Sequence, residues 1–144
     1  MVVDRYKDMC RTIDLVREEF ARFQQLGAGL SSSSWVTDLL QDKLSGTPIR
    51  AYFAAKTAIW LKGTSPFYSA LPYARNERLF SAQLPFIFEV VITIQYLHNQ
   101  ILDGKSGVTS RERISENMLA ANLLKEQLYR YIATQLPRSA RNST

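Results

Sequence analysis

Apolar residues recur at intervals of three and four along most of the chain, which is the spacing of an amphipathic α-helix. The first apolar stripe runs from Tyr6 to Phe23, and charged residues occupy much of the opposite face. Gly27 follows this stripe, and glycine readily takes the left-handed conformation that ends a helix. Later stripes predict further helices over residues 35–44, 49–63, 86–102 and 114–135. The pattern as a whole predicts an all-α bundle of about five to six helices.

Two of the predicted helices are more apolar than one buried face requires. Residues 86–97 are rich in β-branched side chains, but the segment runs to about twice the usual strand length without a breaker. We therefore predict a central helix that is buried on nearly all sides. The last helix has one stripe through Met118 and Leu124 and a second apolar flank at Leu119 and Leu123. We expect the stripe to pack against the chain's own core, and the second flank to pack either against that core or against a partner subunit.

Length and composition are those of one globular domain. The chain has 144 residues, of which 46% are hydrophobic and 22% are charged, so it is too apolar to be disordered. We expect a single helical domain over residues 1–136 and a flexible tail over residues 137–144. A lone cysteine, Cys10, excludes an internal disulfide, and the sequence offers no Cys/His set for a zinc site.

The sequence favours a cytoplasmic protein without a transmembrane segment. Its first residues lack the basic and apolar regions of a signal peptide. Residues 84–102 have nearly the length of a membrane span, but they include Glu89, His98 and several amide side chains. The net charge of +5 could serve an anionic partner. Because the basic residues are scattered singly, we do not expect a nucleic-acid interface.

A candidate functional motif lies at the end of the apolar helix, where residues 96–104 read Tyr-Leu-His-Asn-Gln-Ile-Leu-Asp-Gly. His98 is followed directly by Asn99 and Gln100, and Asp103 lies three residues after Gln100. This segment resembles the first aspartate-rich motif of the trans-type polyprenyl diphosphate synthases. In that motif two aspartates follow the histidine, and a third comes three residues later. The frame is retained here, whereas two of the three metal-binding carboxylates are replaced by amides.

Three further segments resemble motifs of the same family, in the same order along the chain. Gly46 and Arg50 match the motif that holds isopentenyl diphosphate, so the resemblance implies a diphosphate contact for Arg50. Residues 104–108 stand where the family has a double-arginine turn, and residues 125–128 resemble the segment that follows. The resemblance covers about residues 30–135, and the chain has no counterpart of the family's second aspartate-rich motif.

The resemblance implies a short, non-catalytic subunit of a heterodimeric long-chain synthase. Such a subunit would bind no metal or cofactor itself and would pair with a catalytic subunit that binds Mg²⁺. Ionising an allylic diphosphate takes several Mg²⁺ ions held by carboxylates. The amides of Asn99 and Gln100 leave Asp103 as the only charge at the three motif positions. Family position further implies a product tunnel at Ile94 and Gln95, and a partner interface at Leu119, Leu123, Gln127 and Arg130.

Two alternative functions remain open from the sequence. The chain could be a degenerate stand-alone enzyme of the isoprenoid or terpene synthase type, in which Asp103 would still bind Mg²⁺. It could instead be a basic helical adaptor that binds nucleic acid or a membrane, although the scattered charge argues against this. Arg50 has a simpler interpretation as a salt-bridging surface residue, and His98 as a structural polar contact.

Overall fold

A computed structural model describes residues 2–26, 38, 49–64, 76–104 and 110–137. Their elements are the α-helices α1 (Val2–Leu26), α3 (Ile49–Thr64), α5 (Leu84–Asp103) and α6 (Arg111–Gln135), and the π-helical turn η2 (Leu79–Gln83). No strand occurs among these described ranges, and the predicted all-α class is confirmed. The helix predicted over residues 35–44, apart from Asp38, and the tail beyond Pro137 lie outside the described residues.

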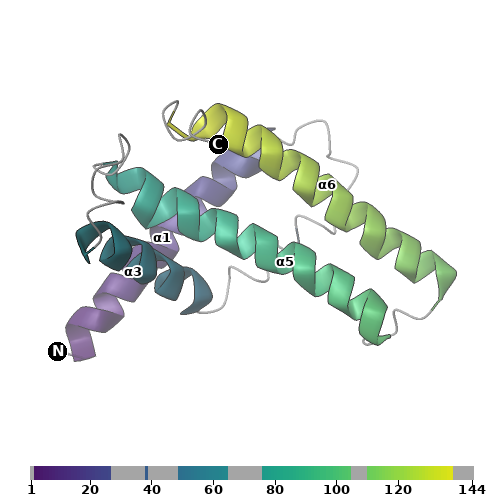
Figure 1. The fold of residues 1–144 in the computed structure, drawn as a ribbon, viewed down its shortest axis with the longest axis horizontal. Coiled ribbons are helices and arrows are strands. Elements are labelled where there is room, and N and C mark those ends of the chain that lie inside the picture. The colour runs from purple at the N-terminus through teal and green to yellow at the C-terminus, as the bar shows by residue number, and fades with distance from the viewer. Residues whose placement is uncertain (1, 27–37, 39–48, 65–75, 105–109, 138–144) are drawn as a thin grey trace.

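The helices form two layers. The long helices α5 and α6 lie side by side and antiparallel, and α1 passes across both of them (Figure 1). α3 lies against α1 and α5. Two hydrogen bonds join the antiparallel helices near opposite ends of the pair. Gln83, directly before α5, donates to the Gln135 carbonyl at 2.7 Å, and Asn117 of α6 donates to Gln100 of α5 at 3.0 Å.

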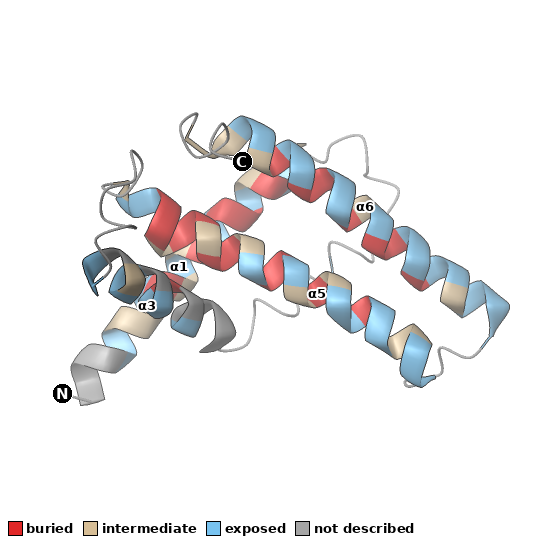
Figure 2. Ribbon diagram, viewed as in Figure 1, coloured by how far each residue is buried: buried red, intermediate tan, exposed pale blue. Residues whose placement is uncertain are grey.

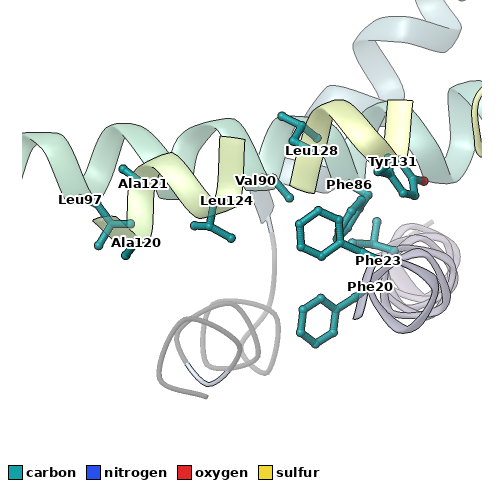
Figure 3. Packing of buried hydrophobic residues seen from close by; sticks show 11 residues of the cluster. Phe20, Phe23, Phe86, Val90, Leu97, Ala120, Ala121, Leu124, Leu128 and Tyr131 are labelled. Atoms are coloured by element: carbon teal, nitrogen blue, oxygen red, sulfur yellow. The ribbon is translucent and has the colours of Figure 1, made fainter. Parts of the chain in front are cut away.

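Aromatic rings fill the place where α1 crosses the helix pair (Figure 3). The Phe86 ring is fully buried, and its centroid lies 5.3 Å from that of Phe23 and 5.2 Å from that of Tyr131. Both contacts are edge-to-face, the arrangement that the charge distribution of aromatic rings favours. Leu124 and Leu97 extend this core along the α5–α6 seam. The fold therefore depends on one continuous core with Phe86 near its centre.

The helix that becomes α5 begins earlier than the sequence predicts, and it runs through a proline. The Asn76 side chain accepts a hydrogen bond from the Leu79 amide at 2.9 Å and so caps the start. Pro85 has no amide hydrogen and would disrupt a regular α-helical turn. Directly before Pro85 the backbone forms the π turn η2, in which the Leu84 amide donates to the Leu79 carbonyl five residues earlier. The helix continues without a break into α5.

The prediction that α5 is buried on nearly all sides is wrong. Its exposed side chains include Phe88 (40%), Val91 (38%), Tyr96 (37%) and Leu102 (81%), and Figure 2 shows pale blue alternating with red along the helix. By length and composition the helix over Leu79–Asp103 could cross a membrane, and half of its apolar window is buried inside the fold. The apolar composition of this helix therefore led to a prediction of more neighbouring elements than the helix has.

The predicted stripes of α1 and α6 are buried at Phe23 and Leu124, which are 2% and 1% exposed, but not at Tyr6 and Met118, which are 63% and 52% exposed. Tyr6 lies toward the N-terminal end of α1, away from the crossing. Met118 lies off the buried face of α6, because its neighbour Asn117 is buried and bonds to α5. Helical periodicity therefore predicts most of the buried face but not its edges or where along the helix it ends.

The central position of Phe86 predicts a large effect of its truncation. We expect Phe86→Ala to lower the free energy of unfolding by about 3–5 kcal/mol, because a buried ring is replaced by a cavity. Phe88→Ala, two residues away and 40% exposed, should cost no more than about 1 kcal/mol. Urea unfolding followed by circular dichroism measures both. Equal losses in the two variants would contradict the core described above.

Candidate functional site

The segment predicted as a degenerate metal motif forms the C-terminal end of α5. Gly104 ends the helix in the left-handed conformation, with φ of 60°. Asn99 and Asp103 are exposed in the turn before it, and Gln100 is half-buried. Among the described residues no three His, Cys, Asp or Glu side chains come together in a way that could hold a metal ion. The residues of this segment do not fit a Mg²⁺ site of the synthase type.

Gln100 instead connects α5 to α6. Its Nε2 donates to the Tyr96 hydroxyl at 2.7 Å, and its Oε1 accepts from the buried Asn117 Nδ2 at 3.0 Å. The same Asn117 amide also donates to the Leu97 carbonyl at 3.3 Å. A buried amide must find partners, because leaving it unsatisfied costs roughly 1–3 kcal/mol. The amide at position 100 thus has a structural role at the helix interface.

Of the residues proposed to contact product and diphosphate, the structure describes the side chains of Ile94 and Gln95 only. Ile94 packs against the core, whereas the neighbouring Gln95 is exposed, as expected for consecutive residues that point about 100° apart on a helix. Arg50 lies in the first turn of α3, and its side chain is outside the described part of the structure.

The four residues predicted to face a partner all lie on α6 and differ in exposure. Leu119 is 60% exposed, Arg130 is exposed and Leu123 is half-buried, all on one side of the helix. Gln127, by contrast, is buried, and its Nε2 donates to the Phe23 carbonyl of α1 at 2.6 Å. Gln127 therefore belongs to the interior of the chain, and the prediction that it faces a partner is corrected.

A buried carboxylate on α1 is the main polar feature that the sequence reading missed. Glu19 is 1% exposed and lies beneath the start of the η2–α5 helix and the end of α6. Arg78 donates to it from Nη2 at 2.9 Å and from Nε at 3.1 Å, and the Tyr131 hydroxyl donates at 2.7 Å. Arg22 forms an ion pair with it from the next turn of α1. We call these four residues the Glu19 cluster.

The Glu19 cluster shifts the proton affinities of its members. Burial alone would raise the pKa of Glu19, but hydrogen bonds from Arg78 and Tyr131 and the charges of both arginines outweigh it and hold the pKa below its usual value. The pKa of Tyr131 is raised, first by burial and then by its bond to the Glu19 carboxylate. The arrangement favours one charge state, with Glu19 ionised and Tyr131 protonated.

The sequence did contain a signal for the Glu19 cluster. Glu19 lies three residues after Val16 and four before Phe23, on the same stripe that forms the core. A carboxylate in the middle of a buried stripe needs positive or donating partners. The two partners from outside α1, Arg78 and Tyr131, are 59 and 112 residues away, so the sequence alone could not name them.

Two hollows lie along α1, and only the first is lined by members of the Glu19 cluster. One, of ≈ 250 Å³, lies between α1 and the start of the η2–α5 helix, and the second, of ≈ 290 Å³, lies between α1, η2 and α3. Both are lined by charges of opposite sign, including Arg11 and Glu77 in each. Small-molecule sites are typically larger and mostly apolar. Neither hollow has the character of a substrate site.

Comparisons with known proteins found no matching family model, no matching curated protein and no matching solved structure. What the described residues define is a small all-α protein whose helices are joined by polar contacts and which exposes apolar side chains on α3, α5 and α6.

The Glu19 cluster predicts an acid-sensitive fold. Because the pKa of Glu19 is lowered on folding, its contribution is complete above the unfolded pKa of about 4.3 and is lost as the pH falls through the folded value. We expect Glu19→Gln to lower the free energy of unfolding at pH 7 by about 2 kcal/mol. The variant should also lose less stability than the parent between pH 5 and pH 3. Urea unfolding across this pH range measures both effects.

Glu18→Gln supplies the matched control, because the neighbouring Glu18 is exposed. It should leave both the stability at pH 7 and the pH dependence within about 0.5 kcal/mol of the parent. If Glu18→Gln and Glu19→Gln behave alike, the Glu19 cluster does not stabilise the fold as described.

Proposed function

We propose that the chain is the non-catalytic small subunit of a heteromeric trans-polyprenyl diphosphate synthase, similar to component A of hexaprenyl diphosphate synthase. Its partner is a catalytic subunit with intact aspartate-rich motifs, in the cytoplasm, and their product is an isoprenoid chain such as a quinone side chain. The structural observation that supports pairing with a partner subunit is that α6 has apolar side chains on two faces. One face is buried in the core, and the other exposes Met118, Leu119 and Tyr129.

The chemistry of the motif segment supports a subunit that does not catalyse. Asn99 and Gln100 offer neutral oxygens where Mg²⁺ prefers carboxylates. Gln100 is moreover engaged by Tyr96 and by Asn117, so binding a metal would break contacts that join α5 to α6. Asp103 alone supplies one charge, whereas the reaction needs several metal ions. The Mg²⁺ of such a complex is expected in the catalytic partner.

The exposed side of α6 has the composition of a protein interface. Met118, Leu119 and Tyr129 are 52%, 60% and 59% exposed, and methionine and tyrosine are enriched at interface centres. The ion pair between Arg130 and Glu126, at 3.9 Å, supplies a polar rim. Burying these apolar side chains against a partner would be favourable, because it removes their surface from water. A partner helix packed on α6 would cover Leu119 together with Leu123.

The contribution of the chain to the complex is stabilisation of the catalytic subunit or control of product length. Product length would be set through Ile94 and Gln95, the tunnel candidates implied by family position. Gln95 is exposed on α5, so a partner could reach it without unfolding the core.

Co-expression with a catalytic subunit encoded nearby tests the pairing. We expect a heterodimer that has prenyl transfer activity neither chain shows alone. Leu119→Asp should weaken the heterodimer at least about tenfold, because a charge replaces an exposed apolar anchor. Leu102→Asp, at an 81% exposed position on α5, should leave pairing intact. Size-exclusion chromatography and titration calorimetry measure both. A catalytic subunit that is fully active, with an unchanged product, in the absence of this chain would sink the proposal.

The stand-alone enzyme is separated from this proposal by assaying the isolated chain. A degenerate synthase would turn over farnesyl diphosphate with Mg²⁺, and Asp103→Ala would abolish that turnover. We expect no turnover by the isolated parent chain in a product assay with radiolabelled substrate.

A further inference from the structure

A second stripe of residues runs along α5 on the side away from the core. The core side of this helix includes Phe86, Val90 and Leu97, which are buried. Successive residues of a helix turn by about 100°, so residues spaced alternately by four and three positions from Leu84 onward lie on the opposite side. We call these residues the outer stripe: Leu84, Phe88, Val91, Gln95, His98 and Leu102. All of them are exposed except the half-buried Leu84.

The outer stripe lacks the charges that the solvent side of a surface helix ordinarily carries. Between residues 79 and 102 the only Asp, Glu, Lys or Arg is Glu89, and it is buried. A helix that is apolar on every side is ordinarily covered on every side. In the isolated chain α5 has one side in the core, whereas Leu102 on the other side is 81% exposed. The outer stripe is therefore a surface that association would cover.

The spacing of the outer stripe fits a second helix better than it fits lipid. Alternating steps of four and three residues average 3.5, the repeat with which helices pack as a coiled coil. Helices that lie on a membrane combine their apolar side with lysine and arginine, and residues 79–102 contain neither. Spanning a bilayer would expose the core side of α5 to lipid, although half of its apolar window is buried inside the fold.

We propose that the outer stripe is the interface of a homodimer, in which α5 packs antiparallel against α5 of a second copy. Its two polar residues, Gln95 and His98, follow one another in the stripe. With the two-fold axis between them, Gln95 lies opposite His98 of the second copy, and Val91 lies opposite Leu102. An amide and a neutral imidazole each donate and accept hydrogen bonds, so the polar residues match. The stripe is thus complementary to itself, as a two-fold interface requires.

The polar pair sets the register of the two copies. Sliding one copy by one heptad would place Gln95 opposite Val91 and His98 opposite Phe88. Each polar side chain would then be covered by an apolar one, and a buried polar group without a partner costs roughly 1–3 kcal/mol. Single polar residues in a coiled-coil seam select register in the same way.

The outline of the fold leaves room for this arrangement. α1 and α3 lie against the N-terminal half of α5, and the C-terminal half extends past them beside α6 (Figure 1). The residues that meet in the dimer, from Val91 to Leu102, belong to this C-terminal half. In an antiparallel pair α3 of the two copies lies at opposite ends, whereas a parallel pair would bring both to the same end.

The homodimer is independent of the pairing proposed above. It uses α5, whereas the surface proposed for the catalytic subunit is on α6, so both contacts together give a complex with two copies of each chain. Gln95 would lie between the two copies of this chain. Of the two contributions to the complex considered above, the homodimer therefore favours stabilisation over control of product length.

The first experiment measures association of the full chain alone. Sedimentation equilibrium over a range of concentrations should show a dimer that dissociates on dilution. Leu102→Asp should raise the dissociation constant at least about tenfold, because it brings a charge from each copy into the interface. Leu119→Asp, at a 60% exposed position on α6, is the matched control and should dimerise as the parent does. Circular dichroism of each variant verifies that the helices are retained.

The second experiment tests the antiparallel register by cross-linking. Cys10→Ser removes the only cysteine, and Val91→Cys and Leu102→Cys are then placed in separate chains. When the two chains are mixed and oxidised, a disulfide should join them, because opposed Cα atoms lie within the roughly 7 Å that a disulfide spans. Neither chain should cross-link to itself, since each position is displaced from its own counterpart by roughly 16 Å of helix.

Three results would overturn the proposal. The first is a chain that stays monomeric at every concentration, and the second is an equal loss of the dimer in Leu102→Asp and Leu119→Asp. The third is a disulfide that Val91→Cys forms with itself, which would indicate a parallel pair. A monomer that floats with lipid vesicles, or whose Val91→Cys thiol is protected only by the catalytic subunit, would assign the outer stripe to that occupant instead. Pairing with the catalytic subunit is measured separately, through Leu119→Asp on α6.

Discussion

The carboxylate of Glu19 is the constraint on which the arrangement of the helices depends. It lies on α1 and receives hydrogen bonds from Arg78, directly before η2, and from Tyr131, near the end of α6. An ionised group buried without such donors would cost several kcal/mol, so alternative packings of these three elements are strongly disfavoured. The directional bonds to Glu19, together with the bond from Gln127 to the Phe23 carbonyl, fix how α1 crosses the pair of long helices.

The helices themselves could be predicted from the sequence, because helical periodicity is a local property. The buried stripe through Val16 and Phe23 on α1, and that through Leu124 on α6, were both predicted and are confirmed. Burial along α5 could not be predicted, since it depends on where α3 and α6 lie and how far each extends. The Glu19 cluster was out of reach for the same reason, because its members come from three separate parts of the chain.

The candidate motif shows the same division between local and non-local information. The sequence shows that positions 99 and 100 carry amides, whose neutral oxygens suit Mg²⁺ less well than carboxylates do. It does not show that Gln100 bonds to Asn117 on the facing helix, because nothing near position 100 indicates that partner. Gln127 was assigned to a partner surface by position, and the structure turns it inward toward the Phe23 carbonyl. One residue along a helix changes the facing direction by about 100°, which is enough to exchange interface for core.

The π turn η2 has a consequence for which substitutions and deletions the chain can accept. A π turn holds one residue more than the α-helical turn it replaces, so the segments before and after it are offset by one position. Arg78 on one side reaches Glu19, while Phe86 on the other lies at the centre of the core. Converting this turn into a regular α-helix with all its residues kept would turn Arg78 by about 100° relative to Phe86, whereas deleting one residue within Leu79–Gln83 would remove the extra residue and keep their relative direction. The phase of this helix, more than its apolar content, is therefore what relatives of this chain must preserve.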